Sequence, residues 1–143
     1  MNATVDKRFA AIPCLILTVC LLSMPSLVRS QENVKISGKT FKTAIEAGYK
    51  EAWSSIKEGD RYFKDGIGTY PMARDHYLYA HQYNPEHAGL NYKLGVCYLF
   101  TDNKYEAIDY LLKAYTLDPQ VSGDIHLLLG MAYQLVLEFD KAM

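Results

Sequence analysis

The sequence has little cysteine and no run of basic side chains. Only three of its 143 residues are cysteine, and two of them lie in an apolar N-terminal stretch, which leaves Cys97 alone in the rest of the chain. A single cysteine forms no intramolecular disulfide, and within a predicted helix it is more typical of a small buried residue than of a reactive thiol. The 15 Lys and Arg and the 16 Asp and Glu are dispersed, which argues against nucleic acid or an anionic bilayer surface as the partner.

Residues suited to catalysis or metal binding also lack the required spacing. His76 and His81 are five residues apart, so they lie on different sides of one helix, and His87 follows a helix-ending proline. We expect these histidines, and acidic neighbours such as Glu58 and Asp60, to be solvated side chains. No glycine-rich loop joins a strand to a helix in the manner of a phosphate site. The sequence therefore predicts no enzymatic activity, no cofactor and no metal.

The first 30 residues are typical of a secretory signal peptide. Lys7 and Arg8 precede an apolar stretch over residues 9–22, and small or modest residues stand at positions −3 and −1 of a cut before Gln31. A membrane anchor and a lipoprotein signal are the two alternatives, since the stretch is nearly long enough to span a bilayer and contains a cysteine in a suitable context. A signal peptide that is cleaved at this position implies an exported protein.

In the middle of the chain, small and apolar residues recur at the spacing that lets two short antiparallel helices pack closely. The first helix carries Leu94, Gly95 and Tyr98, and the second carries Ala107 and Ala114. Gly95 is expected to face the two alanines, because residues without bulk let helix axes approach to about 8 Å. A proline after the second helix cannot continue it, so the chain must turn there.

The same spacing recurs before and after this central unit. The earlier copy has two extra residues in its turn, over residues 64–71, and the later copy stops one turn into its second helix, at Met143. The residues that define the three copies are Gly59, Tyr62, Ala73, Ala80 and Pro85; Leu94, Gly95, Tyr98, Ala107, Ala114 and Pro119; and Leu129, Gly130, Tyr133 and Ala142. Because the last helix would lack its cover, we expect the chain to be a fragment of a longer protein.

This pattern resembles the tetratricopeptide repeat (TPR), whose unit of about 34 residues has Leu-Gly and Tyr in its first helix, two Ala seven apart in its second, and a closing Pro. The family's early Trp is replaced here by Asn91. The resemblance implies an all-α, helix-turn-helix solenoid of about two and a half repeats after a signal peptide. The expected segments are a signal peptide at 1–30, an N-terminal segment at 31–50, and repeats at about 51–86, 87–120 and 121–143, the last truncated. In the N-terminal segment, Phe41, Ile45 and Tyr49 recur every fourth residue, which predicts a leading helix.

Repeats of this kind bind partners in the groove lined by the first helix of each pair. The groove positions implied by the resemblance are Trp53, Ile56, Asp60, Phe63 and Lys64 in the first copy; Gly89, Tyr92, Val96, Leu99 and Phe100 in the second; and Asp124, Leu127, Met131, Gln134 and Leu135 in the third. This set is apolar and aromatic, which suits an extended or helical peptide. It does not supply the Lys and Asn that clamp a chaperone's carboxylate in the family. The alternative is that these faces pack against the leading helix or a following domain.

With its predicted export signal, the region from Trp53 to Met143 is similar to the N-terminal repeats of multidomain OmpA-family envelope proteins. Those proteins continue into a PD40-type propeller and a peptidoglycan-binding OmpA-like domain, and some are associated with type IX secretion. The resemblance implies a periplasmic, outer-membrane-associated scaffold that recruits a protein or peptide partner and reaches peptidoglycan only through a domain absent from this chain. An accessory helical domain of an exported enzyme, with its catalytic domain beyond Met143, and a plain structural spacer are the alternatives.

Overall fold

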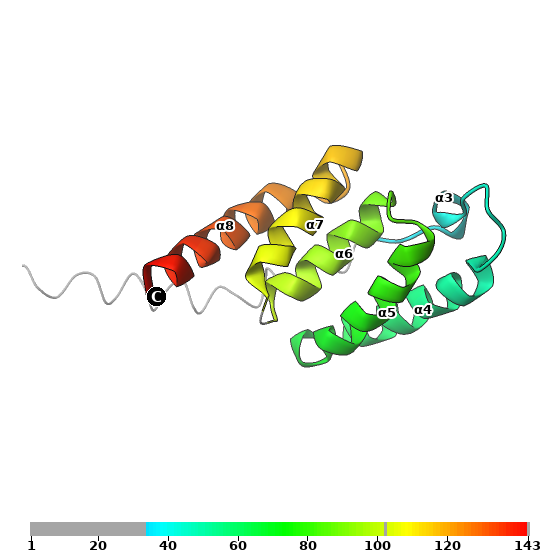
Figure 1. The fold of residues 1–143 in the computed structure, drawn as a ribbon, viewed down its shortest axis with the longest axis horizontal. Helices are drawn as coiled ribbons and strands as arrows, with labels where there is room; N and C mark the ends of the chain where they lie inside the picture. Colours follow the sequence, from blue (N-terminus) through cyan, green and yellow to red (C-terminus); the bar gives the residue numbers. More distant parts are fainter. Residues whose placement is uncertain (1–33, 102, 143) are drawn as a thin grey trace, which may run out of the picture. The chain divides into compact units, whose positions relative to one another are not determined.

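The computed structural model describes residues 34–101 and 103–142, and for residues 138–142 it describes the helix without the side chains. The predicted signal peptide lies outside this part of the chain, as does the side chain of Ala142. Over the described ranges the regular structure is all helical, with no strand, which confirms the all-α part of the prediction (Figure 1). None of the helices in these ranges combines the length and the apolar character needed to cross a lipid bilayer.

Six α-helices and one 3₁₀ helix follow one another over the described residues. They are α3 (Gly38–Phe41), α4 (Tyr49–Asp65), η3 (Ile67–Thr69), α5 (Tyr70–Tyr83), α6 (Ala88–Leu99), α7 (Lys104–Leu117) and α8 (Ile125–Ala142). Consecutive helices pack in pairs, α4 against α5 and α6 against α7, and α8 then packs against α7. Contacts between α5 and α6 join the two hairpins, so α6 has neighbours on several sides and is buried along nearly its whole length.

In each hairpin, a glycine of the first helix lies against a large side chain of the second helix. A Cβ atom on Gly59 would lie 2.7 Å from the Tyr77 ring, and one on Gly95 would lie 2.6 Å from Leu111 Cγ. The alanines at the predicted positions of α5 and α7 are fully buried. The atoms nearest to such a Cβ at Gly95 belong to Leu111, which lies between the two expected alanines on the same face of α7. The glycine supplies the space for a large side chain, and the alanines on either side let the helices approach.

The longer turn of the first hairpin is built as η3. Gly66 ends α4 with a φ of 102°, a value that favours glycine. The hydroxyl of Thr69 donates to the carbonyl of Tyr62 at 2.6 Å and contacts that of Gly66 at 2.8 Å, so it satisfies acceptors at the end of α4. Pro71 then stands in the first turn of α5, where its missing N–H has no cost. The two inserted residues thus extend the loop without disturbing either helix.

The predicted leading helix through Phe41 and Tyr49 is wrong. α3 ends at Phe41, and residues 42–48 are not helical. Gly48 enters α4 with a left-handed φ of 83°, and the hydroxyl of Thr43 bonds within the loop to the backbone of Ile45. The Ile45 side chain is 69% exposed, so the spacing of four residues did not mark a buried face. The side-chain hydrogen bonds of Thr43 and the left-handed backbone of Gly48 favour a loop over the helix that the apolar spacing predicts.

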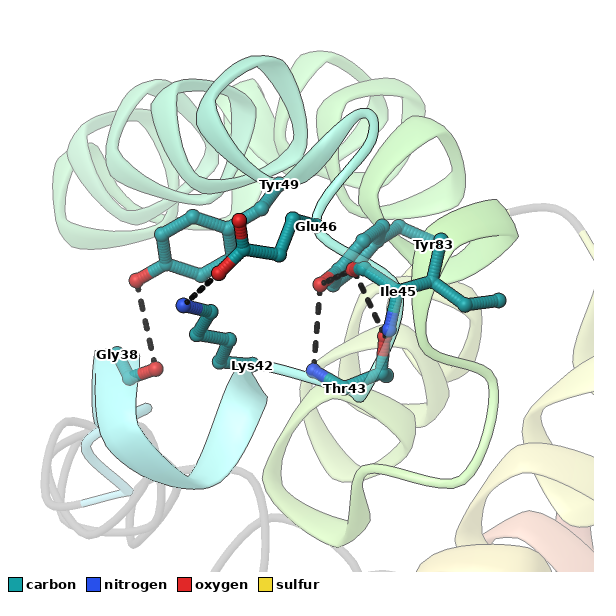
Figure 2. A network of polar contacts seen from close by, with 7 residues as sticks. All are labelled: Gly38, Lys42, Thr43, Ile45, Glu46, Tyr49 and Tyr83. Atoms are coloured by element: carbon teal, nitrogen blue, oxygen red, sulfur yellow. Dashed lines mark hydrogen bonds and ion pairs between the residues drawn. The ribbon is translucent and has the colours of Figure 1, made fainter.

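Residues 34–48, which we call the strap, are held to the helices by polar contacts (Figure 2). The hydroxyl of Tyr83 at the end of α5 donates to the carbonyl of Ile45 at 2.6 Å and accepts from the backbone N–H of Thr43 at 3.2 Å. Tyr49 O–H reaches the carbonyl of Gly38 at 3.4 Å. Outside this figure, the side-chain amide of Asn84 donates to the carbonyl of Phe41 at 2.8 Å. These bonds provide partners for backbone groups of the strap, such as the carbonyl of Ile45 and the N–H of Thr43, that lie outside any helix.

Phe41 anchors the strap by inserting into an aromatic cluster. Its fully buried ring lies 5.3 Å from that of Tyr83, 5.9 Å from His87, 6.1 Å from Trp53 and 6.4 Å from Tyr49, measured between centroids. Tilted and edge-on rings at such distances attract beyond the effect of burial alone. Through Phe41, the strap therefore packs against α4, α5 and the start of α6.

Candidate functional site

The predicted groove residues divide into a buried and an exposed set. Those from α4 and α6 lie mainly in the interior, and those from α8 keep solvent exposure. Ile56, Phe63, Gly89, Tyr92, Val96, Leu99 and Asp124 are buried; Trp53, Asp60, Phe100, Met131 and Leu135 are half-buried; Lys64, Leu127 and Gln134 are exposed. The face formed by α4 and α6 is thus largely filled by packing, as expected if these positions serve the core.

Asp60 is the first of two carboxylates that the helices bury on this face. Lys93 Nζ of α6 lies 2.5 Å from Asp60 Oδ1 of α4, and the hydroxyl of Tyr77 from α5 donates to the same oxygen at 2.7 Å. The rings of Phe63 and Tyr77 lie 5.5 and 5.6 Å from the ammonium, which adds cation–π attraction. Burial, reinforced by the Asp60 charge, raises the pKa of Tyr77.

This cluster corrects the expectation that Asp60 is a solvated acid. It joins three helices of the two hairpins through one carboxylate oxygen, so its role is to fix α6 against α4 and α5. The sequence analysis missed Lys93 and Tyr77, because a lysine within an apolar helix stretch is the only local signal of such a pair.

Asp124 is the second buried carboxylate. The hydroxyl of Tyr92 donates to Asp124 Oδ1 at 2.8 Å, and that of Ser122 does so at 2.5 Å. The other oxygen, Oδ2, is buried and has no hydrogen-bond partner among the described residues. Burial is also the main cause of the raised pKa of Tyr92. The cluster ties the start of α8 to the middle of α6, with one acceptor left unsatisfied.

The three central histidines are all partly buried, contrary to their expected solvation. His87 caps α6, since its Nδ1 accepts from the backbone N–H of Leu90 at 3.2 Å, and its Nε2 lies 3.1 Å from Thr40 Oγ1. Thr40 donates its own proton to the carbonyl of Ser37, so the pattern assigns the proton of His87 to Nε2. His81 Nε2 lies 3.2 Å from Asn91 Oδ1. Burial lowers the pKa of His81 and of His87.

Cys97 is buried in α6, as its position predicts. Burial in apolar surroundings raises the pKa of the thiol, which keeps it protonated and unreactive. Where the structure describes the chain, no three His, Cys, Asp or Glu side chains come together in a way that could hold a metal ion.

A cleft of about 600 Å³ lies between the strap and the start of α6. Residues 34–37 lie outside any helix and Ser37 has an extended backbone, with Val34 and Ile36 buried and Lys35 exposed between them. Val34 Cγ1 lies 3.4 Å from the position that a Cβ on Gly89 would take, so the missing side chain of Gly89 makes room for the strap. Glu86, Asp118 and Val121 also line the cleft. The chain itself therefore presses an extended, alternately apolar segment against one of the predicted groove positions.

The residues that define the repeats are mostly buried in the first two copies and partly exposed in the third. Those of the first two copies lie in the hairpins, where the glycines, alanines and Leu94 are buried and Tyr62 and Tyr98 are half-buried. In the third copy Leu129 is buried, whereas Gly130 and Tyr133 are exposed on α8. The two prolines stand in turns after α5 and α7.

Compared with known proteins, the sequence matches no family model, and neither a curated protein nor a solved structure is significantly similar to it.

Proposed function

We propose that the chain is a non-catalytic, protein-binding scaffold built from TPR-type hairpins. Its partner contributes an extended peptide segment, which lies in the cleft between the strap and the start of α6. Gly89, one of the predicted groove positions, lines this cleft. The recurrence of the same glycine contact in both hairpins supports the repeat assignment, because Gly59 and Gly95 stand 36 residues apart and each receives a large side chain from the following helix.

The observation that carries the proposal is the way in which residues 34–37 lie on this face. Val34 and Ile36 turn inward and Lys35 turns outward, which is the period of two that an extended peptide uses when it docks in a groove. The cleft beside them has charges of both signs, from Lys35, Glu86 and Asp118. Such a polar rim around an apolar floor suits the backbone and side chains of a second extended segment.

We further propose that the scaffold acts in the cell envelope, as the N-terminal part of a longer OmpA-like protein associated with peptidoglycan. The basic start and apolar stretch of residues 1–30 support export to the periplasm, with cleavage before Gln31. Peptidoglycan and the outer membrane would be reached through a further domain, while the helices described here recruit the protein partner.

A photo-crosslinking experiment in the native cell tests this function. A benzoylphenylalanine is placed at position 35, on the exposed edge of the cleft, and at position 72 as the control, because Met72 is 53% exposed on α5 and does not line the cleft. We expect a crosslink to an envelope protein from position 35 and none from position 72. In the crosslinked product, the chain of this protein should begin at Gln31. Equal capture at both positions would refute the cleft as the binding site, and an uncleaved chain recovered outside the envelope would refute export.

A further inference from the structure

The first half of the strap, residues 34–40, is attached to the helices mainly through one histidine. His87 Nε2 lies 3.1 Å from Thr40 Oγ1, and the rings of His87 and Phe41 meet edge-on with centroids 5.9 Å apart. Among the residues that the structure describes, the other hydrogen bond from this half of the strap to a helix is the long one, 3.4 Å, between the Tyr49 hydroxyl and the Gly38 carbonyl (Figure 2). Any change at His87 therefore acts directly on the docking of residues 34–40.

The same imidazole caps α6 with its other nitrogen. Nδ1 accepts from the N–H of Leu90 at 3.2 Å, while the proton assigned to Nε2 faces Thr40, so the neutral ring uses both nitrogens. A second proton would go to Nδ1 and place two donors, Nδ1–H and the N–H of Leu90, against each other. The ring can give that proton an acceptor only by turning, and a turned ring leaves both Thr40 and Phe41.

The surroundings of His87 favour such a turn once the ring is charged. The titratable and charged groups that face it come from every element packed against it, and they are Lys35 of the strap, His81 of α5 through Asn91, Glu86 of the turn before α6, Lys93 of α6, Lys113 of α7 through its ion pair with Glu86, and Asp118 after α7. In the docked position neither carboxylate bonds to the ring, whose described partners are Leu90 and Thr40. A charged ring turned into the cleft approaches Glu86 and Asp118, which stabilise it there.

We propose that protonation of His87 releases residues 34–40 from α6, so that the strap is a pH-sensitive wall of the cleft. Phe41 is the pivot of this movement, because its ring is fully buried and its carbonyl accepts from the Asn84 amide at 2.8 Å. Val34 and Ile36 leave the start of α6, where Val34 lies against Gly89. The helices keep their packing.

Proton linkage gives the direction and the size of the effect. Burial lowers the pKa of His87 in the docked state, whereas the released ring regains the ordinary value of about 6.5. The docked state thus binds fewer protons, and a fall in pH favours release. Below about pH 6.5 the ratio of released to docked strap should rise by up to tenfold per pH unit, until the docked imidazole also titrates.

The inference goes beyond the proposed function, because the movement needs no partner. Under the proposed function it has a consequence for the same cleft. Lys35 and His87 both line that cleft, so release of the strap removes one wall and lowers the affinity for a peptide at acidic pH. A failure of peptide binding and a failure of the strap to move are separate results, since the movement is measured on the chain alone.

Trp53, the only tryptophan of the chain, reports on the first half of the strap. Its ring lies 3.4 Å from the position that a Cβ on Gly38 would take. As the pH of the full chain is lowered from about 7.5 to about 5, we expect the Trp53 emission maximum to move to longer wavelength while the helical circular dichroism stays unchanged. His87→Asn keeps an N-cap acceptor without a titrating group, so it should abolish the shift. The matched control is His126→Asn, at an exposed histidine of α8, which should leave the shift as in the wild type.

A disulfide that locks the strap separates its movement from direct quenching of Trp53 by a charged imidazole. Val34 Cγ1 lies 3.4 Å from the Cβ position of Gly89, so cysteines at both positions are within reach of a bridge. The oxidised Val34→Cys, Gly89→Cys chain should lose the shift and recover it on reduction. A shift that survives in His87→Asn or in the locked chain would overturn the proposal. So would a constant wild-type emission, and so would a loss of helix in step with the shift, which would mean unfolding of the whole chain.

Discussion

Alanine at Gly95 and alanine at Gly130 are predicted to change the stability in opposite directions. In a helix interior, alanine is favoured over glycine by about 1 kcal/mol. Gly130→Ala should stabilise the fold by about 0.5–1 kcal/mol, because its new methyl group meets no atom of the described residues within 4 Å. At Gly95 the methyl carbon would lie 2.6 Å from Leu111 Cγ and 3.1 Å from the Leu111 backbone nitrogen.

The clash at Gly95 outweighs the gain in helix propensity. A side-chain atom could move aside, but the backbone nitrogen of Leu111 can recede only if α7 shifts as a whole. Overpacking of this kind costs about 1–3 kcal/mol, so Gly95→Ala should destabilise the fold by a net ~1–2 kcal/mol. The same chemical change thus stabilises one helix and destabilises another, and the difference measures the closeness of α6 to α7.

Urea and thermal unfolding, followed by far-ultraviolet circular dichroism, measure both variants against the wild type. For a domain of this size, 1 kcal/mol corresponds to a shift in Tm of about 4 °C. Amide exchange along α8 adds a local measure at Gly130, since a helix covered on one side can open before the rest of the fold. Stabilisation by Gly95→Ala would refute the close approach of the two helices, and so would equal effects of the two substitutions.

Two further predictions concern charge. Asp60→Asn should lower the free energy of unfolding by about 3–5 kcal/mol, because it would leave the Lys93 side chain, only 7% exposed, without its counter-ion. Lys93→Met should cost less, because the Asp60 side chain that it leaves unpaired is 31% exposed to water. Urea unfolding measures both values, and equal costs would contradict the argument. Because burial lowers the pKa of His87 below its value of about 6.5 in the unfolded chain, the unfolded state binds more protons as the pH falls through 6.5. Stability should therefore be highest above that pH and decline below it, and His87→Asn, which keeps an N-cap acceptor, should flatten the dependence of Tm on pH; an unchanged slope would count against it.

The helices and their pairing could be predicted from the sequence because the signal is periodic. Glycine and alanine at fixed intervals located the contact faces of α4 to α7, and the prolines located the turns after α5 and α7. The same reasoning predicted a buried Cys97. It did not single out Leu111, whose atoms lie nearest to Gly95, because the alanines alone suggested the close approach of the two helices. Periodicity identifies a face, but not which of its residues reaches the neighbouring glycine.

The strap and the two buried carboxylates could not be predicted in this way. Phe41 enters an aromatic cluster assembled from α4, α5 and α6, and nothing in residues 34–48 shows that these rings will converge. Lys93 finds Asp60 across 33 residues, and Tyr92 finds Asp124 across 32. Each pair depends on how one hairpin stacks on the next, which is decided by packing of the whole and leaves no local pattern.

The burial of these polar pairs bears on where a partner can bind. In a long array of hairpins the first helices would line an open groove, but here Asp60 and Tyr92, both at predicted groove positions, are bonded to Lys93 and Asp124. A ligand that displaced those contacts would leave a buried lysine or a buried carboxylate unpaired, at a cost of several kcal/mol that few peptide contacts could offset. Binding without that cost is open only to surfaces whose polar groups already face water. The edge of the strap beside Gly89 meets this condition, so the proposed peptide partner should engage the chain there and leave the interior of α6 unchanged.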